Sequence, residues 1–149
     1  PARGTTGRSL RRRAAEVSSP RMAPEPSPLR ILVAEDDPAV ARLYTAYAQS
    51  RGHTVLVARD GAEAFSAAAD QGPDLILLDV AMPRVDGRDA LRRLKADPRT
   101  QGIPVLVISA HGSDQHLREL MLQLGAWDVM EKPVDLQIAF NKAERLARR

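Results

Sequence analysis

Cysteine is absent from the 149 residues, and aromatic residues make up only 3% of them. The lack of cysteine excludes disulfides, thiolate nucleophiles and zinc sites with Cys ligands, and it fits the reducing cytoplasm in which we expect the protein. Long hydrophobic runs are also missing, because uninterrupted apolar stretches stop at four or five residues. A membrane-spanning helix needs about 20. Contents of 44% hydrophobic and 28% charged residues are instead typical of a globular protein.

Excess positive charge is confined to one end of the chain. The formal net charge is +3, but the first thirty residues hold seven arginines against two glutamates, and the remainder is close to balanced. Residues 1–28 are rich in Arg, Pro and Ser, so we predict a disordered N-terminal extension followed by one domain over residues 29–149. Because the chain starts with Pro and Met22 stands just ahead of the domain, we interpret the first 21 residues as added by cloning or translated from upstream. A nucleic-acid-binding role would depend on this extension alone.

Strand and helix patterns alternate five times along the domain. Short apolar runs bounded by turn residues predict buried strands, and apolar residues at helical spacing predict the segments between them. Such alternation indicates a parallel sheet with helices on both faces. The strands are expected at residues 31–34, 54–58, 75–78, 105–108 and 127–130.

Apolar stripes define the inner face that each helix is expected to bury. Pro38 suits the first position of the first helix, in which Val40, Leu43, Tyr44 and Tyr47 recur at i, i+3, i+4 and i+7. The later stripes are Ala64, Phe65, Ala68 and Ala69, then Leu91 and Leu94, then Leu117, Leu120, Met121 and Leu124, and last Leu136, Ala139, Ala143 and Leu146.

Polar residues follow four of the five predicted strands, namely Glu35 with Asp36, Asp79, Ser109 and Lys132. Right-handed crossovers bring the carboxyl ends of parallel strands to one edge of the sheet, where ligands bind. Three carboxylates at this edge would repel one another unless a divalent cation neutralised them, and an oxygen-only cluster suits Mg²⁺. A carboxylate nucleophile, a hydroxyl and an ammonium are the groups needed to handle a phosphoryl group. Asp79 would attack phosphorus, while Ser109 and Lys132 would share the charge of the phosphoryl oxygens.

In order and spacing, these residues and their neighbours resemble the receiver domain of two-component response regulators, of which the chemotaxis regulators are one kind. The resemblance rests on residues 31–38, 74–83 with Asp86-Gly87, 107–110, Gly125-Ala126 and Lys132-Pro133, and it covers residues 29–149. It implies a flavodoxin-like (βα)5 fold, a three-layer sandwich around a five-stranded parallel sheet of order 2-1-3-4-5. It also implies a cis peptide bond between Lys132 and Pro133.

The resemblance further implies a phosphoacceptor and not an enzyme acting on a separate substrate. Asp79 would take a phosphoryl group from the phosphohistidine of a sensor histidine kinase or a phosphotransfer protein. Mg²⁺ would be bound by Asp36, Asp79 and the carbonyl of Ala81, with Glu35 assisting, and Ser109 and Lys132 would contact the phosphoryl group. The signal would then pass to a downstream protein by direct contact.

Three positions are expected to modulate this chemistry. Val129 stands where the family often has an aromatic switch residue, so a coupling of Ser109 to an aromatic rotamer is not expected. Ala81, two residues after the nucleophile, cannot orient an attacking water. His111 is either a shield for the phosphoryl group or an ordinary exposed loop residue.

No effector domain follows the last predicted helix, so we expect no nucleic-acid-binding domain in this chain, which is either a stand-alone receiver or a trimmed one. The surface formed by the helix at 117–124, the fifth strand and the last helix is one that such domains often use for partners or a homodimer. Here it carries charged residues that are either interface or solvated: Arg118, Glu119, Asp128, Glu131 and Arg145.

Three alternative functions were weighed against the phosphoacceptor. A pseudo-receiver would bind partners without being phosphorylated, but the acids, Ser109 and Lys132 count against it. An aspartyl phosphatase would need a second acid at the position of Ala81. A flavin-binding flavodoxin would need a Gly/Ser/Thr-rich phosphate cradle in the first loop, which here carries acids.

Overall fold

The computed structural model of the protein describes residues 27–80 and 87–148. In these residues five strands pair in parallel in the order β2-β1-β3-β4-β5, which confirms the predicted fold class and strand order. The elements are, in chain order, β1 (Arg30–Ala34), α2 (Pro38–Ser50), β2 (Thr54–Ala58), α3 (Gly61–Gln71), β3 (Leu75–Asp79), α4 (Gly87–Ala96), β4 (Val105–Ser109), α5 (Gln115–Gln123), β5 (Asp128–Glu131) and α6 (Leu136–Ala147).

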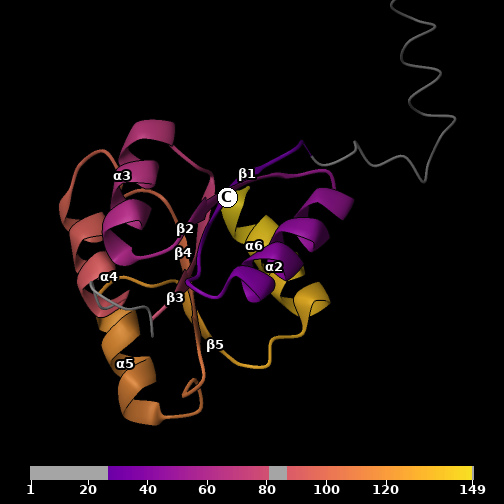
Figure 1. Ribbon diagram of the computed structural model, residues 1–149. Coiled ribbons are helices and arrows are strands. Elements are labelled where there is room, and N and C mark those ends of the chain that lie inside the picture. The colour runs from indigo at the N-terminus through magenta and orange to yellow at the C-terminus, as the bar shows by residue number, and fades with distance from the viewer. Residues whose placement is uncertain (1–26, 81–86, 149) are drawn as a thin grey trace, which may run out of the picture.

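The sheet lies between two layers of helices (Figure 1), with α3, α4 and α5 on one face and α2 and α6 on the other. Alternate residues of each strand point to opposite faces, so Leu32 packs towards α3 and α4 whereas Ile31 and Val33 pack towards α2 and α6. Every residue of the central strand β3 is buried. Burial on both faces explains why the strands appear in the sequence as continuous apolar runs.

Aspartates cap the N-termini of four of the five helices in the described part of the chain. The side chains of Asp37, Asp60, Asp114 and Asp135 each accept a hydrogen bond from a backbone N–H in the first turn of the helix that follows. An N-cap of this kind contributes about 1 kcal/mol and sets where the helix begins. Asp37 caps α2 in this way, and α2 therefore begins directly behind the carboxyl end of β1.

Two side chains differ from the predicted burial pattern. Leu43 was expected on the inner face of α2 but is 56% exposed, because the helix instead buries Ala41, Tyr44 and Ala48 against the sheet. Phe140 was not predicted in the core, yet it is completely buried between α6 and the sheet. The two errors have one cause. Apolar spacing shows which residues share one side of a helix, but the packing of the neighbouring helix determines which of them are buried.

Two further predictions concern the N-terminal extension and membrane-spanning helices. The prediction of a disordered extension falls almost wholly outside the described residues and stays a prediction. Its last part, Ser27, accepts a hydrogen bond through its carbonyl from Arg148 at 3.1 Å. Among the helices of residues 27–80 and 87–148, none has the length and apolar character needed to cross a bilayer.

Candidate functional site

The polar residues predicted to gather at one edge of the sheet are brought there by strand pairing. Ala34 lies opposite Leu78, so Glu35 and Asp79 come next in the register of β1 and β3. Ser109 ends β4, and it pairs with Glu131 of β5, which immediately precedes Lys132. Residues from four strand ends therefore meet at the carboxyl edge of the sheet.

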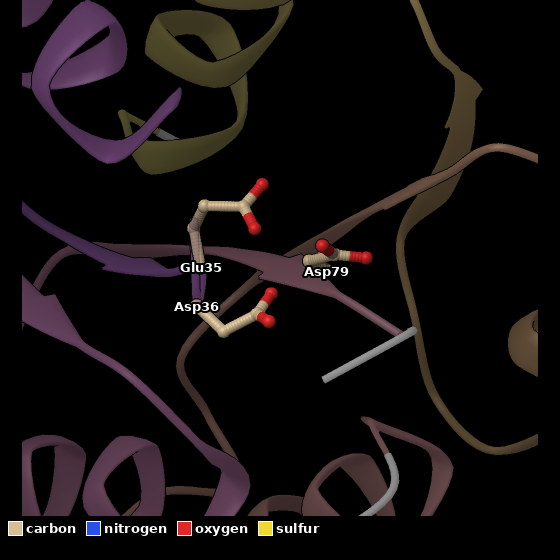
Figure 2. Close-up of side chains that lie close together, drawn as sticks. All are labelled: Glu35, Asp36 and Asp79. Atoms are coloured by element: carbon tan, nitrogen blue, oxygen red, sulfur yellow. The ribbon is translucent and has the colours of Figure 1, made fainter. Parts of the chain in front are cut away.

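Three carboxylates form the centre of this edge. Glu35, Asp36 and Asp79 each contribute an oxygen such that all three oxygens lie within 4.8 Å of one another (Figure 2). Asp36 is exposed, whereas Glu35 and Asp79 are only 3% and 5% exposed. We call these three residues the acidic triad. It combines one solvent-accessible carboxylate with two that are held inside the protein.

Lys132 places an ammonium against the buried members of the acidic triad. Its Nζ donates to Asp79 Oδ2 at 2.9 Å and to Glu35 Oε1 at 3.3 Å. The backbone N–H of Lys132 donates to the carbonyl of Ser109 at 2.9 Å, and the Lys132–Pro133 peptide bond is cis, as the resemblance implied. Burial disfavours the ammonium, but the hydrogen bond and negative charge of Asp79, together with Glu35, outweigh it and raise the pKa of Lys132. The lysine is therefore a fixed positive charge at this site.

Among the acidic triad, Glu35 is the residue whose surroundings disfavour its charged form. Burial, a hydrogen bond with Asp79 and the negative charge of Asp79 raise the pKa of Glu35 to about 7, against the opposing effects of the Asp37 N–H and Lys132. One ammonium does not fully compensate three neighbouring carboxylates, so the buried glutamate resists ionisation near neutral pH. A further cation at the acidic triad would relieve this repulsion.

Ser109 and His111 are adjacent in the loop after β4 but differ in exposure. Ser109 is 2% exposed, and its Oγ accepts a hydrogen bond from the backbone N–H of His111 at 3.0 Å. The side chain of His111 is exposed. Within residues 27–80 and 87–148 no acceptor takes the hydrogen of the Ser109 hydroxyl, which is therefore available to a ligand.

Val129 is buried in β5, where its side chain belongs to the hydrophobic core between the sheet and the helices α4 and α5. Its carbonyl accepts a hydrogen bond from Arg118 at 2.7 Å, and the same guanidinium pairs with Asp128 at 2.7 Å. Lys142 of α6 holds the other oxygen of Asp128 at 2.5 Å. Two charged residues considered for partner contacts, Arg118 and Asp128, are thus engaged within the chain.

Gly87 begins α4 directly against the end of β3. A Cβ at this position would lie 2.9 Å from the carbonyl oxygen of Asp79 and closer still to Val80, which is backbone that cannot move aside easily. Glycine is therefore required for α4 to begin this near to the acidic triad. Ala81, expected to offer a carbonyl and to modulate the site, lies outside the described residues.

The donor set of the acidic triad fits Mg²⁺. All three residues offer carboxylate oxygens, which are the hard ligands that Mg²⁺ prefers, and Asp36 is open to the solvent from which this ion retains several waters. Nitrogen and sulfur ligands, which would favour zinc or copper, are not part of the cluster. Glu35, Asp36 and Asp79 are the described residues that would hold the ion.

A groove beside the acidic triad was missed by the sequence analysis. It has a volume of about 570 Å³, adjoins Glu35 and Asp36, and is lined between α2 and β2 by residues that include Arg42, Val57 and Arg59. Arg59 follows β2, so the rule that singled out polar residues after the other four strands could have found it. For Arg42, an exposed residue inside a helix, the sequence contains no comparable signal.

Comparison with known proteins agrees with this geometry. Residues 31–143 match the model of the family described as "Response regulator receiver domain". The chain is 38% identical over 120 residues to the DNA-binding dual master transcriptional regulator RpaA of Synechocystis, covering 80% of this chain and 49% of RpaA. It is 36% identical over 107 residues to Protein PilH of Pseudomonas aeruginosa, covering 71% of this chain and 87% of PilH. The chain thus spans about half the length of RpaA and most of PilH.

A solved structure with the same fold contains the expected ion. The receiver domain of the sensor histidine kinase PA1611 from Pseudomonas aeruginosa, solved with a magnesium ion coordinated in its active site cleft, matches with a TM-score of 0.75 at 29% identity. The match covers 83% of this chain and all of that one. With the sheet order and the acidic triad, these matches show that the chain belongs to the response regulator receiver domain family of two-component signalling.

Proposed function

We propose that this receiver is a phosphoacceptor in which Asp79 takes a phosphoryl group from a phosphohistidine on a sensor histidine kinase or phosphotransfer protein. The observation that carries the proposal is the environment of Asp79. This carboxylate lies at the end of the buried central strand, receives a hydrogen bond from Lys132 at 2.9 Å and stands within reach of two further carboxylates. A nucleophile on a rigid strand with a fixed cation beside it is suited to phosphoryl transfer.

The reaction moves one phosphoryl group between two side chains. An oxygen of Asp79 forms a bond to phosphorus while the bond from phosphorus to the imidazole nitrogen of the donor breaks, and that nitrogen keeps the electron pair and takes up a proton. Lys132 already donates to Asp79, and its ammonium is placed to donate to the phosphoryl oxygens as negative charge develops on them. The Ser109 hydroxyl is a second donor, because its oxygen already accepts from His111 and its hydrogen has no acceptor among the described residues.

Mg²⁺ held by Glu35, Asp36 and Asp79 would supply neutralisation of the charge that develops on the phosphoryl oxygens. Asp36 is the exposed member of the triad and is therefore the one that solvent ions reach first. Arg42 and Arg59 in the adjoining groove offset part of the negative charge that an incoming phosphate would meet. The signal then passes to a downstream protein by contact, as the resemblance implied.

The test is labelling with a small phosphodonor, such as acetyl phosphate, followed by intact-mass measurement. We expect one phosphoryl group on the wild type with Mg²⁺, none after chelation, and none on Asp79→Asn, which keeps the size of the side chain but removes the nucleophile. Lys132→Met keeps the length of the side chain and removes its charge, and should reduce labelling without moving its site. Undiminished labelling of Asp79→Asn would refute the proposal.

A further inference from the structure

Lysine is rare in this chain, and its lysines have different surroundings. Of the 22 lysine and arginine residues, the lysines are Lys95, Lys132 and Lys142. Lys132 donates to two carboxylates of the acidic triad, and Lys142 of α6 donates to Asp128 at 2.5 Å. Lys95 lies in the last turn of α4 and forms no ion pair with any residue of 27–80 and 87–148. It is therefore the lysine whose positive charge is not engaged by a carboxylate in the described part of the chain.

Two backbone carbonyls hold the amine of Lys95 in place. Its Nζ donates to the carbonyl of Ile103 at 2.8 Å and to that of Gln101 at 3.1 Å, in the connection between α4 and β4. An uncharged amine satisfies both contacts, because it has two N–H groups, one for each carbonyl, and it keeps a lone pair. The contacts of Lys95 therefore do not require the ammonium form, whereas an ion pair does.

Packing fixes this amine beside a hollow in the surface. A Cβ on Gly125 would lie 2.8 Å from Lys95 Cγ, so the aliphatic stem of the lysine passes directly against the Gly125 backbone. Lys95 is partly buried and, together with Asp74 and Trp127, lines a hollow of about 530 Å³. Asp74 accepts a hydrogen bond from the backbone N–H of Arg30 at 2.8 Å and does not pair with the lysine. A small molecule in the hollow therefore meets an amine that is held still.

The partial burial of Lys95 also favours the nucleophilic form of the amine. Burial disfavours the charged ammonium and lowers the pKa of Lys95. The uncharged amine is the form that attacks electrophilic carbon, and lysines with this kind of environment are the reactive ones in proteins. The environment of Lys95 thus agrees with the carbonyl contacts and the hollow.

We propose that Lys95 is a site of acylation by acyl phosphates, a class of small molecule with two electrophilic centres. The Nζ lone pair forms a bond to the acyl carbon, the bond from that carbon to the phosphate oxygen breaks, and phosphate leaves with the electron pair. The nitrogen then loses one proton to water and becomes an amide. Transfer to Asp79 uses the phosphorus of such a molecule, so acylation of Lys95 requires neither Mg²⁺ nor the acidic triad. Because the amide keeps a single N–H, one of the two carbonyls loses its donor.

The test treats the full chain with acetyl phosphate in EDTA and quantifies acetyllysine at each of the three lysines by peptide mass spectrometry. We expect Lys95 to be acetylated about fivefold faster than Lys142, the effect of one ion pair, and to exceed Lys132, which meets two carboxylates, by more. Guanidinium chloride at a concentration that unfolds the chain should remove these differences. Lys95→Arg keeps a charged donor for the carbonyls, and it should lose the fast site while the two slow ones react as before.

Acetylation of Lys95 no faster than that of the other two lysines in the folded chain would overturn the inference. A preference for Lys95 that persists in guanidinium chloride would also overturn it, because the local sequence and not the fold would then be its cause. Both measurements are made without Mg²⁺, so a failure here leaves the proposed transfer to Asp79 untouched, and a failure of that transfer leaves this inference untouched.

Discussion

Replacing Asp36 with asparagine should stabilise the protein without metal and abolish its response to Mg²⁺. The substitution keeps the size of the side chain and removes one charge from a triad whose oxygens lie within 4.8 Å of one another. At that separation, repulsion between two unit charges amounts to about 1 kcal/mol in water and about 3 kcal/mol at an effective dielectric constant of 20. Because Asp36 is exposed, the lower value applies, and the free energy of unfolding should rise by about 1 kcal/mol.

The same charge is what the ion would bind. For the wild type, Mg²⁺ at ten times its dissociation constant should add about 1.4 kcal/mol to the free energy of unfolding, by mass action. In a domain of this size 1 kcal/mol corresponds to a shift in Tm of roughly 4 °C. Asp36→Asn should therefore melt a few degrees above the wild type in EDTA. As Mg²⁺ is added, the Tm of the wild type should rise while that of Asp36→Asn stays constant.

Thermal unfolding followed by circular dichroism measures both effects, in EDTA and across a Mg²⁺ titration at constant ionic strength. Asp37→Asn is the matched control, because Asp37 is the neighbouring acid, lies outside the triad, and caps α2 in a role that asparagine fills equally well. It should behave like the wild type. A lower Tm for Asp36→Asn in EDTA, or a Mg²⁺ response equal to that of the wild type, would refute the repulsion argument.

Three further predictions concern stability and the lifetime of the phosphoryl group. Hydrogen bonding to Arg51, opposed by burial and aided by His53, lowers the pKa of Glu144 from 4.5 to about 2, so its stabilisation is complete above pH 4.5 and is lost as the pH falls through 2. That shift corresponds to about 3 kcal/mol of stability, which the partial exposure of Arg51 reduces to about 2 kcal/mol. In urea unfolding, Glu144→Gln should therefore lower the free energy of unfolding by about 2 kcal/mol at pH 7 but by little at pH 2. Deleting residues 1–21 should leave Tm and Mg²⁺ affinity unchanged, and a fall of several degrees on truncation would mean that the extension packs on the domain. Autodephosphorylation should be slow, and Ala81→Asn should accelerate it by helping to orient water. If neither Ala81→Asn nor His111→Ala alters the decay of the phosphorylated protein, neither residue controls access of water.

Local patterns were enough to predict the layers of this fold but not the contacts between them. The apolar runs at 75–78 and 105–108 appear as buried strands, because both faces of a parallel strand are covered and no polar alternation is needed. The strand order came from the resemblance to receivers, since periodicity carries no information on which strands are neighbours. The same limit explains Leu43 and Phe140: a stripe shows which residues share a helix face, whereas the packing of α2 beside α6 decides how that face is turned.

Long-range polar contacts were beyond prediction for a related reason. Glu144 meets Arg51 and His53 across more than ninety residues of sequence, and each is unremarkable where it stands in the chain. The raised pKa of Glu35 depends on burial and on Asp79, and neither can be known before the strands are paired.

The central claim is that Asp79 is the phosphoacceptor, and chemical mapping of the modified residue tests it most directly. An aspartyl phosphate is an acyl phosphate, which borohydride reduces to homoserine, whereas a phosphoserine is left intact. After reaction with a small phosphodonor and Mg²⁺, reduction and proteolysis, peptide mass spectrometry should find homoserine at position 79 and at no other aspartate. Acid-stable phosphate on Ser109, or homoserine at another position with Asp79 unchanged, would contradict the account.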